Sequence, residues 1–206
     1  EGFWQVRPLL GERRGDLRHY ARTLKVPYVD DPSNEDARFG RARTRQAIAA
    51  LGLDVDALAE TAGRLARARI ALQARTAEVA RRIAQEGAAL GLPTGTVEID
   101  RDGLAAVERE TQLRLLSRAV GWVGGAPYPP RVAALENALD RALGGAGTTL
   151  QGVQIMVGRG RIHVAREAAA VARVEGIAGR GAWDGRWYLA GDAIDGLTVR
   201  ALGEAG

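Results

Sequence analysis

The sequence has no cysteine and only two histidines, His19 and His163, which lie far apart in the chain. The absence of cysteine excludes a disulfide framework, a thiolate metal site and a cysteine nucleophile. Two isolated histidines favour surface or structural roles over a zinc site or a catalytic triad, so we expect no bound metal. The sequence also lacks an apolar run of about eighteen residues and a signal-peptide pattern, which predicts no membrane association and a cytoplasmic location.

The composition is that of a globular protein with an excess of positive charge. The 206 residues are 46% apolar, which is enough for one large or two small domains with a real core. The net charge is +4 and the pI is about 10.1. Nearly all the basic residues are arginines, and Lys25 is the single lysine. This balance is consistent with an RNA partner but does not identify one.

The spacing of apolar residues predicts a mainly α fold with small β elements, in the α+β class. The predicted helices span residues 15–24, 35 to about 50, 54 to about 87, 108 to about 120, and 130–143. Residues 91–95 are interpreted as a connector and 97–99 as a short strand. Alternating apolar residues at 153–157 and 162–164, around a turn at 158–160, predict a β-hairpin with one buried face. Residues 168–181 are interpreted as a linker, followed by strands at 183–189 and 197–200.

Acids, amides and arginines are most concentrated in residues 31–45. Asp31-Pro32-Ser33-Asn34-Glu35-Asp36 follows Val29, a pattern that predicts a strand, a turn and a helix start capped by Ser33 or Asn34. In a helix beginning at residue 35, Arg38, Arg41 and Arg45 share one face and Arg43 points elsewhere. Such a face suits phosphate or carboxylate groups. The alternative is a solvated helix whose acids and arginines pair with each other.

The helix predicted from residue 54 carries an apolar stripe and a basic side. Leu58, Leu65, Leu72 and Val79 recur every seven residues and predict one buried face. The polar side is rich in arginine, at positions 64, 67, 69, 75, 81 and 82. This side is either a track for RNA phosphates or an ordinary solvated surface.

Two aromatic residues beside the later helices have two interpretations. Trp122 and Tyr128 lie at apolar helix ends, where side chains usually pack against neighbours. The alternative is that they stack on RNA bases. We expect packing.

Three separated elements in the first 45 residues resemble the tRNA(Ile)-lysidine synthetases. They are Arg7-Pro8-Leu9-Leu10, the run Tyr28-Val29-Asp30-Asp31-Pro32-Ser33-Asn34-Glu35-Asp36, and Phe39 two residues before Arg41-Ala42-Arg43-Thr44-Arg45. That family shows an RPLL-like segment, then W-x-x-D-x-S-N-x-D, then an aromatic residue before R-N-x-[IL]-R. The sequence departs from this pattern at Tyr28, Ala42 and Thr44, where the family commonly has Trp, Asn, and Ile or Leu. As a pattern, the likeness extends to about residue 167.

The resemblance implies an ATP-dependent carbon–nitrogen ligase of tRNA processing. Members use ATP to adenylate the wobble cytidine of the CAU anticodon in tRNA(Ile), and the amine of free lysine then displaces AMP to give lysidine. The implied partners are this tRNA, lysine and ATP with Mg²⁺, and the oligomeric state stays open, with a homodimer as one option. The implied catalytic residues are Asp31, Asn34, Arg41, Arg43 and Arg45. The implied tRNA-binding or substrate-binding residues are Arg7, Arg38, Arg64, Arg67, Arg75, Arg81 and Arg82.

The family's PP-loop ATP pyrophosphatase fold binds phosphates with an S-G-G-x-D-S loop, and this sequence contains no such loop. We therefore expect an internal or carboxyl-side portion of a larger enzyme that neither binds ATP nor makes lysidine alone. On this interpretation, residues 1–50 end the catalytic domain, residues 51–167 form a helical domain with a terminal hairpin, and residues 168–206 hold a linker and part of a small β unit. Two alternatives are a non-catalytic RNA-binding adaptor and a helical protein-interaction module.

Overall fold

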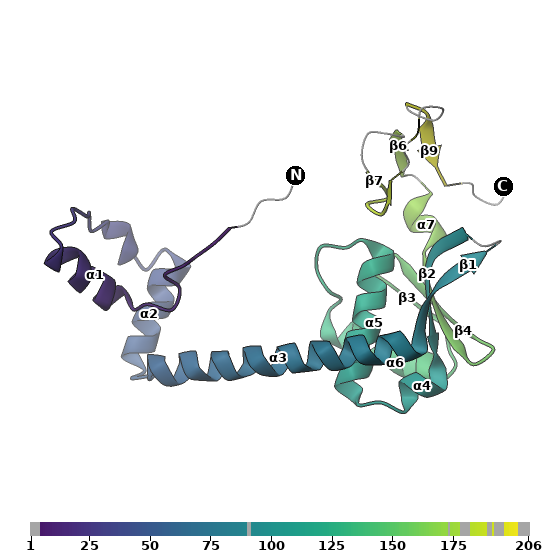
Figure 1. Ribbon diagram of the computed structural model, residues 1–206, viewed down its shortest axis with the longest axis horizontal. Helices are drawn as coiled ribbons and strands as arrows, with labels where there is room; N and C mark the ends of the chain where they lie inside the picture. Colours follow the sequence, from purple (N-terminus) through teal and green to yellow (C-terminus); the bar gives the residue numbers. More distant parts are fainter. Residues whose placement is uncertain are drawn as a thin grey trace. The chain divides into compact units, whose positions relative to one another are not determined.

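The computed structural model describes residues 5–89, 92–172, 174–177, 182–188, 191 and 196–201. The chain divides into two compact units, Glu1–Gly63 and Arg64–Gly206. Helices dominate and all the sheets are antiparallel (Figure 1), which confirms the predicted α+β class.

The first unit contains α1 (Arg14–Thr23), the 3₁₀ helix η1 (Pro32–Asn34), α2 (Gly40–Ala50) and the beginning of α3 (Val55–Ile83). Helix α1 forms close to its predicted bounds, although none of its residues is buried. The capping of α3 agrees with the sequence prediction, because the Asp54 carboxylate accepts hydrogen bonds from the backbone N–H groups of Asp56 and Ala57 at 2.9 and 3.3 Å. The strand expected near residue 29 is absent from the described residues, and the helix expected from residue 35 begins at Gly40.

The first unit has almost no hydrophobic core. Among its described residues only Ala42 is buried, whereas Leu10, Val29 and Leu51 are 78%, 90% and 72% exposed. Stability of a small domain depends mainly on the apolar surface that it removes from water. Residues 5–63 therefore bury too little apolar surface to be stable by themselves.

The second unit is built on a five-stranded sheet in the order β1-β2-β5-β4-β3 (Figure 1). The strands are β1 (Ala84–Ala89), β2 (Leu92–Asp100), β3 (Thr148–Leu150), β4 (Val153–Gly158) and β5 (Arg161–Arg166). The hairpin of β4 and β5 was predicted, and its turn residues Arg159 and Gly160 take positive φ angles of 51° and 75°, as a tight two-residue hairpin turn requires.

The β1–β2 hairpin corrects two sequence predictions. The long helix ends at Ile83 instead of continuing to residue 87, and the presumed connector at 91–95 belongs to β2 from Leu92 onward, with residues 90 and 91 outside the described part. The predicted short strand at 97–99 lies in the second half of β2. Strand β2 pairs with β5, with Ile99 opposite Ile162. Pairing in the sheet therefore determines the structure of residues 84–100, which do not continue the helix.

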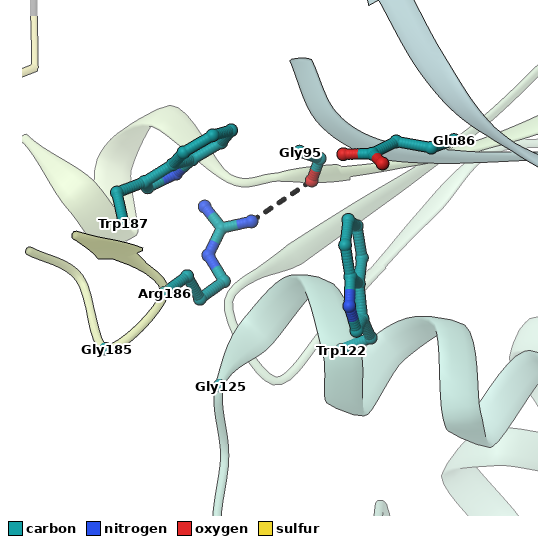
Figure 2. Close-up of a pocket in the computed structure, with 7 residues that line it drawn as sticks. All are labelled: Glu86, Gly95, Trp122, Gly125, Gly185, Arg186 and Trp187. Atoms are coloured by element: carbon teal, nitrogen blue, oxygen red, sulfur yellow. Dashed lines mark hydrogen bonds between the residues drawn. The ribbon is translucent and has the colours of Figure 1, made fainter. Parts of the chain in front are cut away.

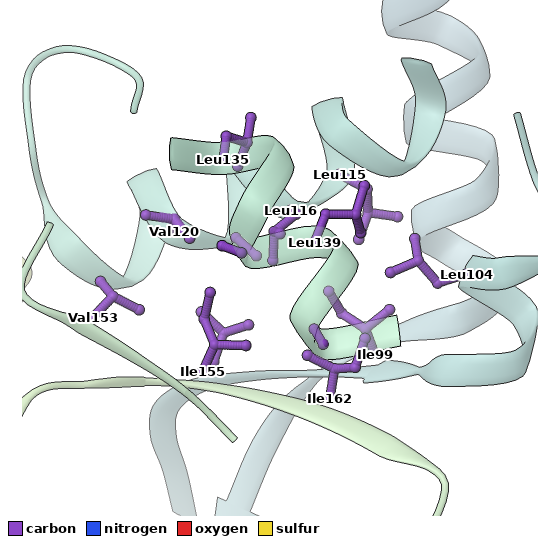
Figure 3. Packing of buried hydrophobic residues seen from close by; sticks show 14 of the residues in the cluster. Ile99, Leu104, Leu115, Leu116, Val120, Leu135, Leu139, Val153, Ile155 and Ile162 are labelled. Atoms are coloured by element: carbon purple, nitrogen blue, oxygen red, sulfur yellow. The ribbon is translucent and has the colours of Figure 1, made fainter. Parts of the chain in front are cut away.

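Two helices cover one face of this sheet. They are α5 (Arg109–Gly124), which contacts β2, β4 and β5, and α6 (Val132–Leu143), which contacts β3 and β4 (Figure 3). Both helices were predicted, whereas the short α4 (Arg101–Ala105), capped by Asp100, was not. The core side chains are Val79, Ile99, Leu104, Leu115, Leu116, Ala119, Val120, Val123, Leu135, Ala138, Leu139, Ala142, Val153, Ile155, Ile162 and Val164.

Helix α3 is buried along only part of its apolar stripe. Val79 is completely buried in the core, but Leu58 and Leu65 are 47% and 66% exposed. The prediction of one buried face along the whole helix is therefore wrong for its first half. Heptad spacing makes a stripe continuous, but burial requires a neighbouring element, and the core begins only at about Thr76.

The C-terminal elements also differ from the sequence predictions. Helix α7 (Ala168–Val171) and strand β6 (Glu175–Ile177) occupy part of the presumed linker, and residues 178–181 lie outside the described part. The strand expected at 183–189 is instead a hairpin of β7 (Ala182–Trp183) and β8 (Trp187–Tyr188), because Asp184 and Gly185 both take positive φ angles. The strand β9 (Thr198–Arg200) pairs with β6.

An ion cluster holds the β7–β8 hairpin on the rest of the unit. The Asp184 carboxylate, only 4% exposed, accepts hydrogen bonds at 2.9 Å from Nε and Nη2 of Arg166 and at 3.1 Å from Arg186. Arg186 also donates to the carbonyl oxygen of Gly95 at 3.0 Å. Burial raises the pKa of Asp184, but the hydrogen bonds and charges of the two arginines outweigh it and the net pKa is lowered.

The core and the exposed stripe of α3 can be tested with matched substitutions. Leu116→Ala removes a fully buried side chain from α5 and should lower the free energy of unfolding by about 2–5 kcal/mol. Leu65→Ala, at the exposed part of the stripe, should change it by less than about 0.5 kcal/mol. Urea unfolding of the whole chain, followed by circular dichroism, measures both. Equal losses would contradict the assignment of the core.

Candidate functional site

The Asp31–Asn34 turn is built by local hydrogen bonds. The Asp31 carboxylate accepts a hydrogen bond from the backbone N–H of Ser33 at 2.8 Å, and the side-chain amide of Asn34 donates to the carbonyl oxygen of Asp31 at 3.1 Å. Pro32 occupies the first position of η1, where its fixed φ fits and its missing N–H costs nothing. Asp31 thus caps the turn itself, and the expectation that Ser33 or Asn34 caps the long following helix is wrong, because α2 has no side-chain cap.

The segment between the turn and α2 holds Arg38 in place. The Asp36 carboxylate accepts hydrogen bonds from the backbone N–H of Arg38 at 2.9 Å and from its Nε at 2.8 Å, with Nη2 at 2.7 Å. The side-chain hydrogen bond from Arg38 lowers the pKa of Asp36 and raises that of Arg38. Because these bonds keep residues 35–39 out of the helix, Arg38 does not share the helical face of Arg41 and Arg45.

A hollow of about 210 Å³ lies between the turn and the start of α2. It is lined by Ser33, Asn34, Phe39, Arg41, Ala42 and Arg45. Arg41 and Arg45 are four residues apart and reach it from the same side of α2, and the buried Ala42 lies beside them. A small residue at position 42 leaves space in the hollow that a longer side chain would fill.

Two guanidinium groups, an amide and a hydroxyl around one small hollow form a donor-rich site. Arginine stays charged at any ordinary pH and can bind a carboxylate or phosphate through two parallel hydrogen bonds. Among the residues that the structure describes, no acidic side chain lines the hollow. The arrangement therefore suits a small anionic group rather than a cation.

The structure brings only part of the predicted catalytic set to this hollow. Arg41, Arg45 and Asn34 line it, and Asp31 adjoins it through the hydrogen bonds of the turn. Arg43 lies on α2 but is exposed and does not line the hollow. Arg7 lies in a separate turn, where its carbonyl oxygen accepts from the N–H of Leu10 at 3.3 Å. Sequence reasoning missed Phe39 as a wall of the site, although its place before the arginines was noted.

Arg75 and Arg82 of α3 form ion pairs with neighbouring acidic residues. At 100° per residue, Arg64, Arg67, Arg75 and Arg82 share a face and Arg81 is rotated away from it. Arg75 contacts Glu108 at 3.2 Å and Glu78 at 3.6 Å, and Arg82 contacts Glu78 at 3.8 Å.

The hydrogen bond to Glu108 raises the pKa of Arg75. The pKa of Glu108 is in turn lowered, first by its own backbone N–H and then by Arg75 and Thr111. Neighbouring acids thus partly neutralise the positive charge of α3, and the exposed Arg67 and Arg81 are available to an anionic partner.

The described part of the chain contains no group of three or more histidine, aspartate or glutamate side chains that could hold a metal ion. Within the same residues, no helix is long and apolar enough to cross a membrane.

Comparison with known proteins gives consistent relationships. A family model described as a PP-loop domain matches residues 2–51. The chain is 39% identical over 209 residues to the tRNA(Ile)-lysidine synthase of Ruegeria pomeroyi, covering 100% of this chain and 48% of that protein. It is 31% identical to the protein of that name from Mesorhizobium japonicum, covering 98% of this chain and 44% of that one. The chain therefore spans about half the length of the relatives that it matches.

The cap of the Asp31–Asn34 turn should depend on pH. Hydrogen bonds from the backbone N–H and the hydroxyl of Ser33 lower the pKa of Asp31. The stabilisation by the cap is then fully present above the ordinary aspartate pKa of about 3.9 and is lost as the pH falls through the lower value of the folded state. The amide shift of Ser33, followed by NMR, should titrate below about 3.9 and lose this titration in Asp31→Asn. A midpoint at or above that value would contradict the cap.

Proposed function

Because the chain belongs to the family of tRNA(Ile)-lysidine synthases, we propose that it is part of an enzyme that uses ATP to join lysine to the wobble cytidine of the CAU anticodon in tRNA(Ile). Within that enzyme, residues up to about 50 contribute to the rim of the catalytic domain, and the following residues bind the tRNA. The protein from Ruegeria pomeroyi matches along the whole chain, which supports assigning both halves to one enzyme.

The observation that carries the proposal is the hollow with Arg41 and Arg45 on one wall. It has the size and donor set for one phosphate or carboxylate group, and the site lies within the residues that match the PP-loop domain. We propose that Arg41 and Arg45 hold a negatively charged group of AMP, lysine or RNA close to the reacting centre. Fixed positive charges stabilise negative charge that develops during group transfer without having to move a proton.

ATP, with Mg²⁺, would supply the activating group in the whole enzyme. The residues here that fit an anionic part of it are Arg41, Arg45 and the amide of Asn34. They lack the succession of glycine N–H groups that cradles several phosphates. We therefore propose that they bind a single anionic group and leave the main nucleotide contacts to other residues.

Exposed arginines of α3 are proposed to contact the tRNA backbone. Arg67 and Arg81 are exposed, whereas Arg75 and Arg82 are paired with Glu78 or Glu108. Phosphate contacts by such arginines would release counterions and make binding salt-dependent. An arginine that is already paired within the protein gains less free energy from a phosphate contact, so Arg75 should contribute less than Arg67 to the affinity for tRNA.

One observation favours a second candidate, a helical protein-interaction module. Leu58 and Leu65, which lie seven residues apart on α3, are 47% and 66% exposed. Single exposed leucines are common, but apolar residues on one face of a helix can bind a partner helix. Competition between tRNA and an acidic protein for the chain distinguishes this candidate from the enzyme. A non-catalytic adaptor would instead bind tRNA without any associated ligase activity in the intact protein.

The hollow can be tested by arginine substitutions in the intact enzyme. Arg41→Ala and Arg45→Ala should each lower kcat for lysidine formation by about 10²- to 10³-fold while the protein folds normally, because each removes a fixed positive charge. Arg43→Ala, on the same helix but outside the hollow, is the matched control and should lose less. Wild-type turnover of Arg41→Ala would mean that Arg41 is an ordinary surface residue. An equal loss of turnover in Arg43→Ala would mean that the anion site is not in the hollow.

The chain itself should bind tRNA without making lysidine. Filter binding should show that the logarithm of affinity falls linearly with the logarithm of salt concentration, and Arg67→Ala should reduce the slope by about one. Incubation with tRNA, ATP and radioactive lysine should give no labelled tRNA. Affinity that does not change with salt would contradict the phosphate contacts, and labelled tRNA would contradict the expected inactivity.

A further inference from the structure

A cavity of about 290 Å³ lies where the β7–β8 hairpin meets the β1–β2 hairpin and the C-terminal end of α5 (Figure 2). It is lined by Glu86, Gly95, Trp122, Gly125, Gly185, Arg186 and Trp187. All these residues belong to the second unit, and none was singled out as a site from the sequence except Trp122. The volume lies at the small end of ligand sites, about the size for one planar ring system.

Two tryptophans stand at opposite sides of this cavity. Figure 2 shows Trp187 on one side, Trp122 on the other, and the guanidinium group of Arg186 between them. The guanidinium carbon lies 5.8 Å from the centre of the Trp187 ring, which is within range of a cation–π interaction. The space between Arg186 and Trp122 is therefore bounded by a flat cation on one side and an indole ring on the other.

The Trp187 and Arg186 side of the cavity is rigid. Arg186 is fixed by its hydrogen bonds to Asp184 and to the carbonyl oxygen of Gly95, at 3.1 and 3.0 Å. Trp187 lies so close to Gly95 that a Cβ atom there would come within 2.3 Å of the ring, and Gly95 has a positive φ of 65°. A side chain at position 95 is thus excluded both by the ring and by the backbone conformation.

Trp122 has the opposite character, because its side chain is 51% exposed. About half of the surface of Trp122 is in contact with solvent, so the expectation that it packs against its neighbours is wrong for that half. Trp122 also borders a second hollow of about 240 Å³, which is lined mainly by apolar residues, with Thr76 and Arg118. An indole with free surface beside an arginine-bounded space is the usual platform for an unstacked nucleic-acid base.

Glu86 adds a hydrogen-bond acceptor to the cavity. It lies opposite Val97 in the sheet register, on the face that carries α5, and its carboxylate points into the space above Trp122 (Figure 2). Glu86 makes no hydrogen bond or ion pair with any residue that the structure describes, so its oxygens can accept from a ligand. A carboxylate accepts hydrogen bonds from the exocyclic amino group of cytosine and rejects the carbonyl oxygen that uracil has in its place.

We propose that this cavity binds one unpaired, amino-bearing base of RNA, with cytosine as the best fit. The base stacks between Trp122 and the guanidinium of Arg186, and its amino group donates to Glu86. The identity of the RNA that supplies this base rests on the proposed function, whereas the pocket itself is defined by the residues that line it. It gives the second unit a base-specific contact besides the phosphate contacts of α3.

The test uses the whole chain and fluorescein-labelled RNA hexamers of cytidine or uridine, with binding measured by fluorescence anisotropy at physiological salt. The wild-type chain should bind the cytidine hexamer about fivefold or more tightly than the uridine hexamer. Trp122→Ala should weaken binding of the cytidine hexamer about five- to 150-fold, the range that stacking contributes per base. Tyr128→Ala, at an aromatic residue that is 78% exposed and outside the cavity, is the matched control and should change nothing.

Glu86→Gln tests the recognition of the amino group with little change of shape. A glutamine amide can accept from cytosine or donate to uracil, so this variant should bind both hexamers with equal affinity while Trp122 still contributes stacking. Equal binding of the two hexamers by the wild-type chain, or an unchanged affinity in Trp122→Ala, would overturn the proposal. An equal loss in Tyr128→Ala would do the same, because it would reveal non-specific aromatic contacts.

The same variants separate this pocket from the function proposed for the chain. If tRNA binds with the expected salt dependence but Trp122→Ala has no effect on the hexamers, the pocket proposal fails and the tRNA function stands. If the hexamers bind in a Trp122-dependent way but tRNA does not bind, the pocket stands and the assigned RNA substrate fails.

Discussion

Burial of one face of the five-stranded sheet under α5 and α6 is the interaction on which the second unit depends. It removes Ile99, Ile155 and Ile162 from water together with the apolar sides of both helices. The last turns of α3 pack into this core through Val79. The core therefore sets the point at which the long helix is buried against other elements. The ion cluster around Asp184 then adds the β7–β8 hairpin to the edge of this framework and so completes the cavity beside Trp122.

The hollow between the Asp31–Asn34 turn and α2 depends on a different kind of interaction. Its walls are held by short-range hydrogen bonds within residues 31–46, such as those of Asp31 and Asp36 and the donation from Gln46 to the carbonyl oxygen of Glu35 at 2.8 Å. Local bonds of this kind can form a precise turn without a core, but exposed hydrogen bonds contribute little net stability. Residues 5–63 therefore present a defined site on a unit that lacks the buried apolar surface to fold alone.

Sequence periodicity was reliable where one face of an element alternates with a solvated face. Helices α5 and α6 and the β4–β5 hairpin follow their patterns. In β4, for example, Val153 and Ile155 are buried, whereas Gln154 and Met156, which alternate with them, are exposed. Helix α1 forms as predicted, but none of its residues is buried. Periodicity failed at the β1–β2 hairpin, where residues 84–89 continue the composition of the helix but pair with β2. For the candidate site, the sequence and its family resemblance pointed to Asp31, Asn34, Arg41, Arg43 and Arg45. The separation of Arg43 from the hollow and the pairing of Arg38 with Asp36 became evident only from the three-dimensional contacts.

The sequence by itself determined the mixed α+β class, the main helices, the hairpin at residues 153–166 and the cluster of arginines after the Asp31–Asn34 turn, because these depend on local periodicity, turn chemistry and motif. Only the tertiary structure decided which arginines share a hollow, which part of the α3 stripe is buried, and that Glu86, Trp122 and Arg186 surround one cavity. Those residues are separated by up to about a hundred positions, and their proximity results from strand pairing and the Asp184 ion cluster. No local pattern records a contact made across such a distance.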